Sequence, residues 1–387
     1  MNGLLLLLAV QSGPTVVVVP MPDAKEVTIQ ALVRVPKLSD AERLCLKVGW
    51  DTLLEGSEAY SKPTLRRYMQ SGGKPVVARV MGDHLYLRAT VPPGQLANGA
   101  SMILSLLREP LLKAEDLERS LSEAKEPKVD AWSAALDPER WRETKPNRAE
   151  IVSTFRRVVR PENLILAFGG AIAGDAVGAQ VRKFEEWKPP AERGFVRSWA
   201  ATPAIALASP DSIGIVELFG PEFGPKDPSF PAQLLATSAL ALGKGGLQFR
   251  FAREAQAWSY RQEGFLQPGP DGLRLRLIFA HAGSAEIHEK IEPYRAGLVA
   301  AIEKWGQADR LRALEFLRSY FEAGIGTSPI RLLPEGSAIA SLEERTHLAA
   351  WWRMKFGEEF RVDSLMRKIE QVTLESLKET AKSTLER

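Results

Sequence analysis

The feature of this 387-residue sequence that most limits its fold is an order of secondary-structure signals that occurs twice. Each half begins with β-branched or alternating apolar residues, continues with a helical pattern and a pair of strands, and ends in further helices. Two halves of similar size with this order imply an internal duplication and an α+β fold, in which an antiparallel-rich sheet is covered by helices in each half. The strands expected are residues 15–19, 27–35, 76–80, 84–91 and 164–169 in the first half, and 212–219, 260–266 and 273–280 in the second.

The two halves are separated by residues 188–203, which are rich in proline and show little periodicity. Such a segment is typical of a linker. We therefore expect an N-terminal domain of residues 13–187 and a C-terminal domain of residues 204–387. Within the first domain, residues 15–19 and 27–35 are expected to pair as an antiparallel hairpin.

Local signals place a few residues on these elements. Ser39 with Glu42 three positions later forms a capping-box pattern, so a helix is expected to begin there and to end at Gly56. Residues 364–384 have the pattern of one C-terminal helix. His84, in an alternating segment, is expected to be a half-exposed sheet residue.

A glycine-rich turn opens the segment of residues 243–260, GKGGLQFRFAREAQAWSY. Gly243, Gly245 and Gly246 allow positive φ angles and a close approach of the backbone to a ligand or another chain. A tight turn between two helices is the alternative explanation for these three glycines.

The same segment carries Arg253 and Tyr260, 260 − 253 = 7 positions apart. Its periodicity fits both a strand and a helix. We favour a short helix carrying Arg253, then a turn, then a strand beginning near Trp258. This arrangement would bring the Arg253 guanidinium and the Tyr260 hydroxyl together, where their donors suit a peptide carbonyl or a developing oxyanion. A surface ion pair of Arg253 with Glu254, with Tyr260 half in the core, is the alternative.

Composition excludes several classes of function. The 51 lysines and arginines against 48 aspartates and glutamates give a net charge of only +3, which is no footprint for nucleic acid. Cys45 is the one cysteine, so an internal disulfide is excluded, and its apolar neighbours indicate a buried position. The four histidines are scattered and form no H-E-x-x-H or inverted H-x-x-E-H pattern, so a zinc site within the chain has poor support.

The N-terminus holds a short apolar run, Leu4–Val10, followed by the small-residue sequence Val10-Gln11-Ser12. The run is far too short to span a bilayer, so no membrane span is expected. It is either a short export signal or a hydrophobic first strand. Export to the periplasm is slightly favoured over a cytoplasmic location.

Short motifs follow one another in a fixed order over nearly the whole chain. They are residues 15–20 (TVVVVP), 53–57 (LLEGS), 71–73 (SGG), 115–119 (EDLER), 155–169 (with RPENL) and 245–260 (with GGL, RE and Y). In order and spacing they resemble the pitrilysin/insulinase-type metallopeptidases, the inverted zincins. The resemblance implies an insulinase-like fold of two homologous α/β-sandwich halves.

The chain departs from this family at the zinc motif. If Gly56-Ser57 is aligned with the family's Gly-Thr, the zinc-binding positions fall on Lys47, Trp50 and Asp51. Neither imidazole ligand and no glutamate base is then present, so nothing would lower the pKa of a bound water. The resemblance therefore implies a degenerate zinc site, no metal on this chain and no peptidase activity of the chain alone.

Arg253 and Tyr260, in contrast, match the family's Arg/Tyr pair, which acts on substrate bound at the zinc. In the family's two-subunit members, one chain carries the zinc motif and the other carries this pair. The resemblance thus implies an inactive subunit of a heterodimeric zinc peptidase. Its partner would be a paralogue with H-x-x-E-H that holds the zinc, and its ligands would be unfolded or extended peptides. A non-enzymatic scaffold of the same fold, or a peptide-binding protein without a cutting partner, is the alternative.

Overall fold

A computed structural model of the chain provides the structure. The residues it describes are 13–35, 38–70, 74–81, 83–124, 146–172, 174–188, 205–208, 213–241, 243–259, 261–268, 272–282, 289–323 and 341–386. They form two compact units, one holding most of the described chain up to residue 196 and the other the described chain from residue 197 on. Apart from Lys188, the expected linker of residues 188–203 lies outside the described residues, so the domain boundaries stay a prediction.

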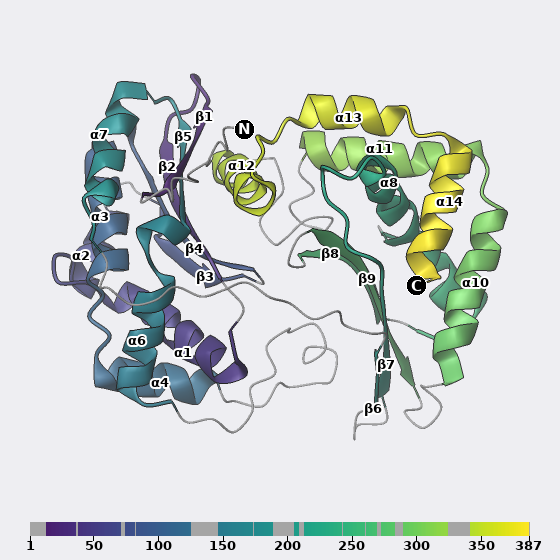
Figure 1. Ribbon diagram of the computed structural model, residues 1–387, viewed down its shortest axis with the longest axis horizontal. Helices are drawn as coiled ribbons and strands as arrows, with labels where there is room; N and C mark the ends of the chain where they lie inside the picture. Colours follow the sequence, from purple (N-terminus) through teal and green to yellow (C-terminus); the bar gives the residue numbers. More distant parts are fainter. Residues whose placement is uncertain are drawn as a thin grey trace, which may run out of the picture. The chain divides into compact units, whose positions relative to one another are not determined.

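The first unit is built on a five-stranded mixed sheet with the strand order β1-β5-β2-β4-β3. Its helices lie on one side of this sheet in Figure 1. The strands are β1 (Thr15–Pro20), β2 (Val27–Arg34), β3 (Val77–Val80), β4 (His84–Val91) and β5 (Leu164–Gly170). The helices are α1 (Asp40–Asp51), α2 (Lys62–Gln70), α3 (Leu96–Arg108), α4 (Ala114–Ala124), α6 (Arg148–Val158) and α7 (Gly174–Glu185), with 3-10 turns η1 (Leu53–Glu55), η2 (Pro93–Gln95) and η3 (Pro161–Asn163).

The hairpin expected between β1 and β2 is wrong. Strand β5 lies between them, parallel to β1 and antiparallel to β2. The chain leaving β1 crosses the end of β5, where Met21 N–H donates to the carbonyl of Gly170. Gly170 has a φ of 124°, and a Cβ there would lie 2.4 Å from the Glu26 carbonyl oxygen. Because β5 comes more than 120 positions later in the sequence, no local signal could reveal its insertion.

His84 is fully buried, so its expected half-exposed position is wrong. The reason is that β4 lies inside the sheet, between β2 and β3, and seven of its eight residues are buried. The capping box of α1 is confirmed, because the Ser39 hydroxyl accepts from the Glu42 N–H and the Glu42 carboxylate accepts from the Ser39 N–H. Cys45 is buried, as expected.

The second unit contains a four-stranded antiparallel sheet with the order β6-β7-β9-β8. In Figure 1, α8, α10, α11 and α14 lie on one side of it. The strands are β6 (Ile205–Ala208), β7 (Ile213–Phe219), β8 (Arg261–Pro268) and β9 (Leu273–Ala282). The helices are α8 (Phe230–Ala241), α9 (Leu247–Phe249), the π-helical turn η4 (Arg250–Ala255), α10 (Ile291–Glu303), α11 (Gln307–Ala323), α12 (Leu342–Phe356), α13 (Val362–Glu370) and α14 (Leu374–Leu385).

Two elements of the second unit differ from expectation. Strand β6 has no counterpart among the expected strands. The single helix expected over residues 364–384 is two helices, α13 and α14, because the Thr373 hydroxyl accepts from the Ser376 N–H and starts a new helix. No helix in the described part of the chain combines the length and the apolar character that a bilayer crossing needs.

Each unit thus follows the shared order of strands, helix, strand pair and helices, and the α+β class is confirmed. The sheets are antiparallel-rich, since β1–β5 is the one parallel pair among the described strands. A common origin of the two units stays a prediction.

Replacing Gly170 tests the crossing of the chain over β5. Gly170→Ala is expected to lower the free energy of unfolding by more than about 1 kcal/mol, because the residue has a positive φ and no space for a Cβ. Gly178→Ala in α7 is the control, since nothing lies within 4 Å of its Cβ position, and it should be neutral or stabilise by up to about 1 kcal/mol. Urea unfolding measures both. Equal stability of the two variants would contradict this account of the crossing.

Candidate functional site

Two of the three α1 positions that are expected to align with the family's zinc motif, Lys47 and Asp51, form an ion pair. Lys47 Nζ lies 2.8 Å from Asp51 Oδ2, one helical turn away, and both side chains are partly exposed. Lys47 therefore already pairs with Asp51, which is the one carboxylate among the three aligned positions. An exposed pair of this kind contributes under about 1 kcal/mol to stability.

Trp50, which is expected from the sequence to align with the family's glutamate base, belongs to the core. Its side chain is fully buried, with its ring centroid 6.3 Å from that of Phe155 in α6. The indole therefore joins α1 to α6 by packing.

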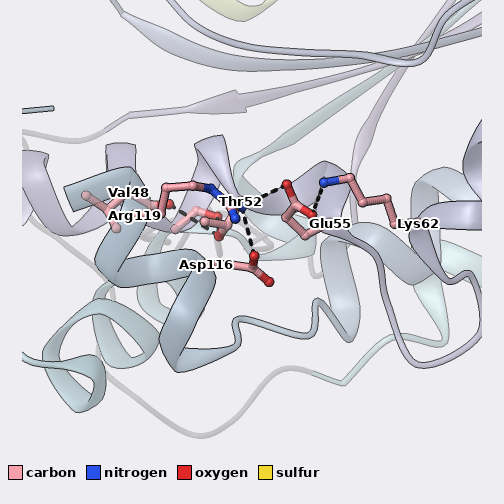
Figure 2. Close-up of polar contacts among 7 residues, drawn as sticks. Val48, Thr52, Glu55, Lys62, Asp116 and Arg119 are labelled. Carbon is pink, nitrogen blue, oxygen red and sulfur yellow. Dashed lines mark hydrogen bonds and ion pairs between the residues drawn. The ribbon is translucent and has the colours of Figure 1, made fainter. Parts of the chain in front are cut away.

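A network of charged side chains lies directly after α1 and is shown in Figure 2. Glu55 in η1 accepts from Lys62 in α2 and, at 3.0 Å, from Arg119 in α4. Arg119 also donates to the largely buried Asp116 at 2.8 Å. These contacts connect the end of α1 to α2 and α4 through charge-assisted hydrogen bonds.

This part of the chain does not fit zinc. A zinc site needs three or four imidazole, thiolate or carboxylate ligands. Lys47, Trp50 and Asp51 offer one carboxylate, which is already paired, and the nearby carboxylates of Glu55 and Asp116 are paired with arginine or lysine. Across the described ranges there is no group of three or more histidine, cysteine, aspartate or glutamate side chains arranged to hold a metal ion.

In the second unit, the glycine-rich turn connects α8 to α9. Gly243 has a φ of 69°, and its carbonyl accepts from the Gly246 N–H at 3.1 Å. A Cβ on Gly245 would lie 3.3 Å from Arg312 Cδ. The turn therefore has the geometry of a tight helix-to-helix turn, and a contact with substrate stays a proposal.

Arg253 lies in a helical segment, which is one of the two possibilities, strand or helix, that the sequence left open. It belongs to η4, where the Gln256 N–H donates to the Phe251 carbonyl in the π-helical pattern. Its side chain is exposed, with Cζ 5.3 Å from the Phe249 ring centroid. Runs of π-helix are rare and frequently occur at functional sites.

After η4 the chain reverses sharply. Ala257 has a φ of 52°, which is uncommon for a residue other than glycine. The N–H groups of Trp258 and Ser259 both donate to the carbonyl of Ala252, at 2.8 and 3.2 Å. Trp258 and Ser259 thus lie beside Ala252 of η4. Tyr260 itself lies outside the described residues, and β8 begins at Arg261.

An aromatic cluster holds this segment in place. Phe251 packs edge-on against Trp258 with ring centroids 5.7 Å apart, and Trp258 stacks on Phe279 of β9. Phe251 also contacts Tyr294, and a Cβ on Gly297 of α10 would lie 2.0 Å from the Phe251 ring. The backbone that carries Arg253 is therefore anchored on two other elements.

The structure also contains a cluster of charged side chains around Asp309, beside the glycine-rich turn, which the sequence did not predict. Asp309 of α11 accepts from Arg250 at 3.4 Å, from Arg312 at 3.1 Å and from the Gly306 N–H at 3.0 Å. Burial alone would raise the pKa of the Asp309 carboxyl, but the Gly306 N–H and the two guanidinium groups outweigh it and lower that pKa. The 59 positions between Arg250 and Asp309 leave no local signal for this contact.

Solved structures of known proteins share this fold. A protease from Helicobacter pylori superposes with a TM-score of 0.74 at 10% identity, over 96% of this chain and 94% of that chain. A peptidase M16 inactive domain from Pseudomonas fluorescens gives 0.70 at 12% identity, over 97% and 93%. A conserved protein from Enterococcus faecalis V583 gives 0.70 at 11% identity, over 96% and 95%. No family model and no curated protein matches the sequence.

The chain therefore has the fold of peptidase M16, the pitrilysin/insulinase type, over almost its whole length. The resemblance inferred from the sequence motifs is confirmed at the level of the fold.

A glutamate at position 50, as in the family's zinc motif, should make the folded chain less stable. Trp50→Glu is expected to lower the free energy of unfolding by about 3–5 kcal/mol or more, because it removes a buried indole and buries a carboxylate. Asp51→Asn, at a partly exposed position, should cost less than about 1 kcal/mol. Urea unfolding compares them. A Trp50→Glu chain as stable as the wild type would show that packing does not explain the departure at this position.

The charge of Asp309 should contribute to stability in a pH-dependent way. Its pKa is lowered on folding, so the contribution is present above the ordinary aspartate pKa of about 3.9 and is lost as the pH falls through the lower, folded value. Asp309→Asn should cost about 1 kcal/mol at pH 7, and the difference from wild type should narrow as the pH falls below about 4. Chemical unfolding at a series of pH values measures this. Glu315→Gln, on the exposed side of the same helix, is the control and should change stability by less than about 0.5 kcal/mol throughout.

Proposed function

We propose that this chain is the zinc-less subunit of a two-chain peptidase and that it contributes Arg253 and Tyr260 to a peptide bound at the zinc of a partner subunit. The observation that carries the proposal is a contrast between two regions of one M16 fold. The α1 positions hold an ion pair and a core tryptophan, whereas the Arg253 segment presents an exposed guanidinium on an anchored, unusual backbone.

The backbone around Arg253 supports this role. A π-helical turn followed by a positive φ at Ala257 is costly to form, and such conformations persist when the surrounding structure stabilises them. Here the Phe251 and Trp258 rings provide that stabilisation. A solvated surface arginine would need none of this support.

The return of the chain at Ser259 supports a pairing of Arg253 with Tyr260. Trp258 and Ser259 are hydrogen-bonded to Ala252, the residue before Arg253. Position 260 follows directly in the sequence, and the proposed role requires its phenol to reach the same peptide as the guanidinium. A planar guanidinium and a phenolic hydroxyl would then donate hydrogen bonds to the peptide near the carbonyl under attack.

The partner supplies the remaining chemistry in this proposal. Zinc and a glutamate base on the H-x-x-E-H subunit would activate water for attack on the peptide bond. This chain's residues would orient the substrate and stabilise the negative charge that develops on its carbonyl oxygen. Its glycine-rich turn, Gly243–Gly246, would lie beside the bound peptide.

Removing the guanidinium tests the proposal. This chain is mixed with an H-x-x-E-H subunit from the same genome, and cleavage of an unstructured peptide library is followed by mass spectrometry. Arg253→Ala should lower kcat/KM of the mixture about 10²–10³-fold, and Tyr260→Phe should also lower it, because each removes a preorganised donor. Thermal unfolding should be unchanged for the exposed Arg253.

Arg361→Ala is the matched control, since the Arg361 side chain is exposed and pairs with Glu359 alone among the described residues, and it should retain full activity. Activity on mixing that ignores Arg253→Ala would favour the scaffold alternative. Cleavage and stoichiometric zinc with this chain alone would contradict the proposal entirely.

A further inference from the structure

A cavity of about 230 Å³ lies beside the glycine-rich turn, wholly within the second unit. It is formed where α8, the turn and α11 meet. Sites that enclose a whole small-molecule ligand are typically about 300–1,000 Å³, so this cavity is of a size for a single residue.

The apolar part of the cavity comes from two helices and the end of α10. Ala239 of α8 and Ala313 of α11 contribute methyl groups, and Trp305 and Phe316 contribute aromatic rings. Alanine at two facing positions leaves the space that a larger side chain would fill. Such a lining accepts an aliphatic side chain.

The polar part carries an excess of positive charge. Lys244, Arg250 and Arg312 line the cavity together with one carboxylate, that of Asp309, so the balance is 3 − 1 = +2. Asp309 is already paired with both arginines. Lys244 is exposed and has no ion-pair partner among the residues that the structure describes.

Two donors of the lining residues lack an acceptor. Arg250 Nε and Trp305 Nε1 are buried and make no hydrogen bond with any described residue. Trp305 is 5% exposed. Buried donors without a partner are uncommon in folded proteins, and both belong to the lining of the same cavity.

From these observations we infer that the cavity binds the C-terminal residue of a peptide, with an aliphatic side chain against Trp305 and Phe316 and its main-chain carboxylate at Lys244 and Arg312. The inference rests on the proposed function in taking a peptide as the ligand. A terminal residue has its carboxylate and its side chain on one Cα atom, so both groups fit a cavity of this size. An internal acidic residue next to an aliphatic one would need room for two.

The cavity shares the Gly243–Arg250 segment with the candidate substrate site. Arg253 lies one helical turn beyond Arg250. A peptide end held at the cavity would therefore be bound by the same segment that presents Arg253. Binding of the peptide's C-terminal residue at the cavity would select substrates by their chain end and not by an internal sequence.

Binding is tested on this chain alone, without a partner subunit, so that the result is independent of peptidase activity. Fluorescein-labelled hexapeptides ending in leucine are titrated by fluorescence anisotropy as the free acid, as the C-terminal amide, and as an amide with glutamate before the leucine. The free acid should bind at least about tenfold more tightly than either amide, because a charge-assisted hydrogen bond is lost in both.

Three variants locate the binding. Lys244→Ala and Arg312→Ala should each weaken the free acid by about tenfold and leave the amides unchanged. Ala239→Leu should weaken free acid and amides alike, because it fills the space for the side chain. Lys304→Ala and Arg318→Ala, an exposed lysine and a helix α11 arginine that do not line the cavity, are the matched controls and should bind as wild type. Circular dichroism and thermal unfolding check that each variant is folded.

Equal binding of the free acid and the amide would overturn the inference, as would unchanged binding in Lys244→Ala, which is exposed and should fold normally. Tight binding of the glutamate-containing amide would show that the cavity takes a side-chain carboxylate, and this too would overturn the assignment to a chain end. If the free-acid preference holds while Arg253→Ala leaves the activity of the mixture unchanged, the cavity stands and the proposed function fails. If Arg253→Ala lowers the activity of the mixture but the free acid binds no more tightly than the amide, the cavity inference fails and the proposed function stands.

Discussion

The second unit depends on the burial of helix α8. All of its residues except Pro231 are buried, so it has no polar face and is stable only when other elements surround it. Its polar side chains are satisfied internally, as the Ser238 hydroxyl donates to the Ala313 carbonyl of α11 and the Gln233 carboxamide accepts from Thr384 of α14. Close packing continues at β8, where a Cβ on Gly264 would lie 2.4 Å from that of Ala241. Because α8 is fixed in this way, the glycine-rich turn at its end is fixed as well.

Helix α1 of the first unit is less completely buried than α8 of the second. Its partly exposed edge carries the Lys47–Asp51 ion pair, at positions expected from the sequence to align with the family's metal ligands. On the buried side of α1, Trp50 belongs to the core. The Glu55–Arg119 contact joins η1, the turn after α1, to α4. Packing and ion pairs thus join these elements within the first unit.

The proposed substrate residues of the second unit fall within 18 positions of the sequence, from Gly243 to Tyr260. One end of this segment contributes to a cationic, partly apolar cavity, and the other presents Arg253. Between them, Phe251 and Trp258 anchor the backbone to α10 and β9. In the two proposals, this one segment contacts two parts of the same extended peptide. One contact is at Arg253 and the other is at the cavity.

The sequence by itself determined the α+β class, most of the helices and strands, the capped start of α1 and the burial of Cys45. Each of these follows from local periodicity, from capping chemistry or from the residue types at fixed spacing. Only the tertiary structure decided the insertion of β5 between β1 and β2, the burial of His84, and the contact of Arg250 with Asp309. These depend on residues far apart in the chain, whose pairing is set by the packing of whole elements and leaves no mark on the sequence nearby.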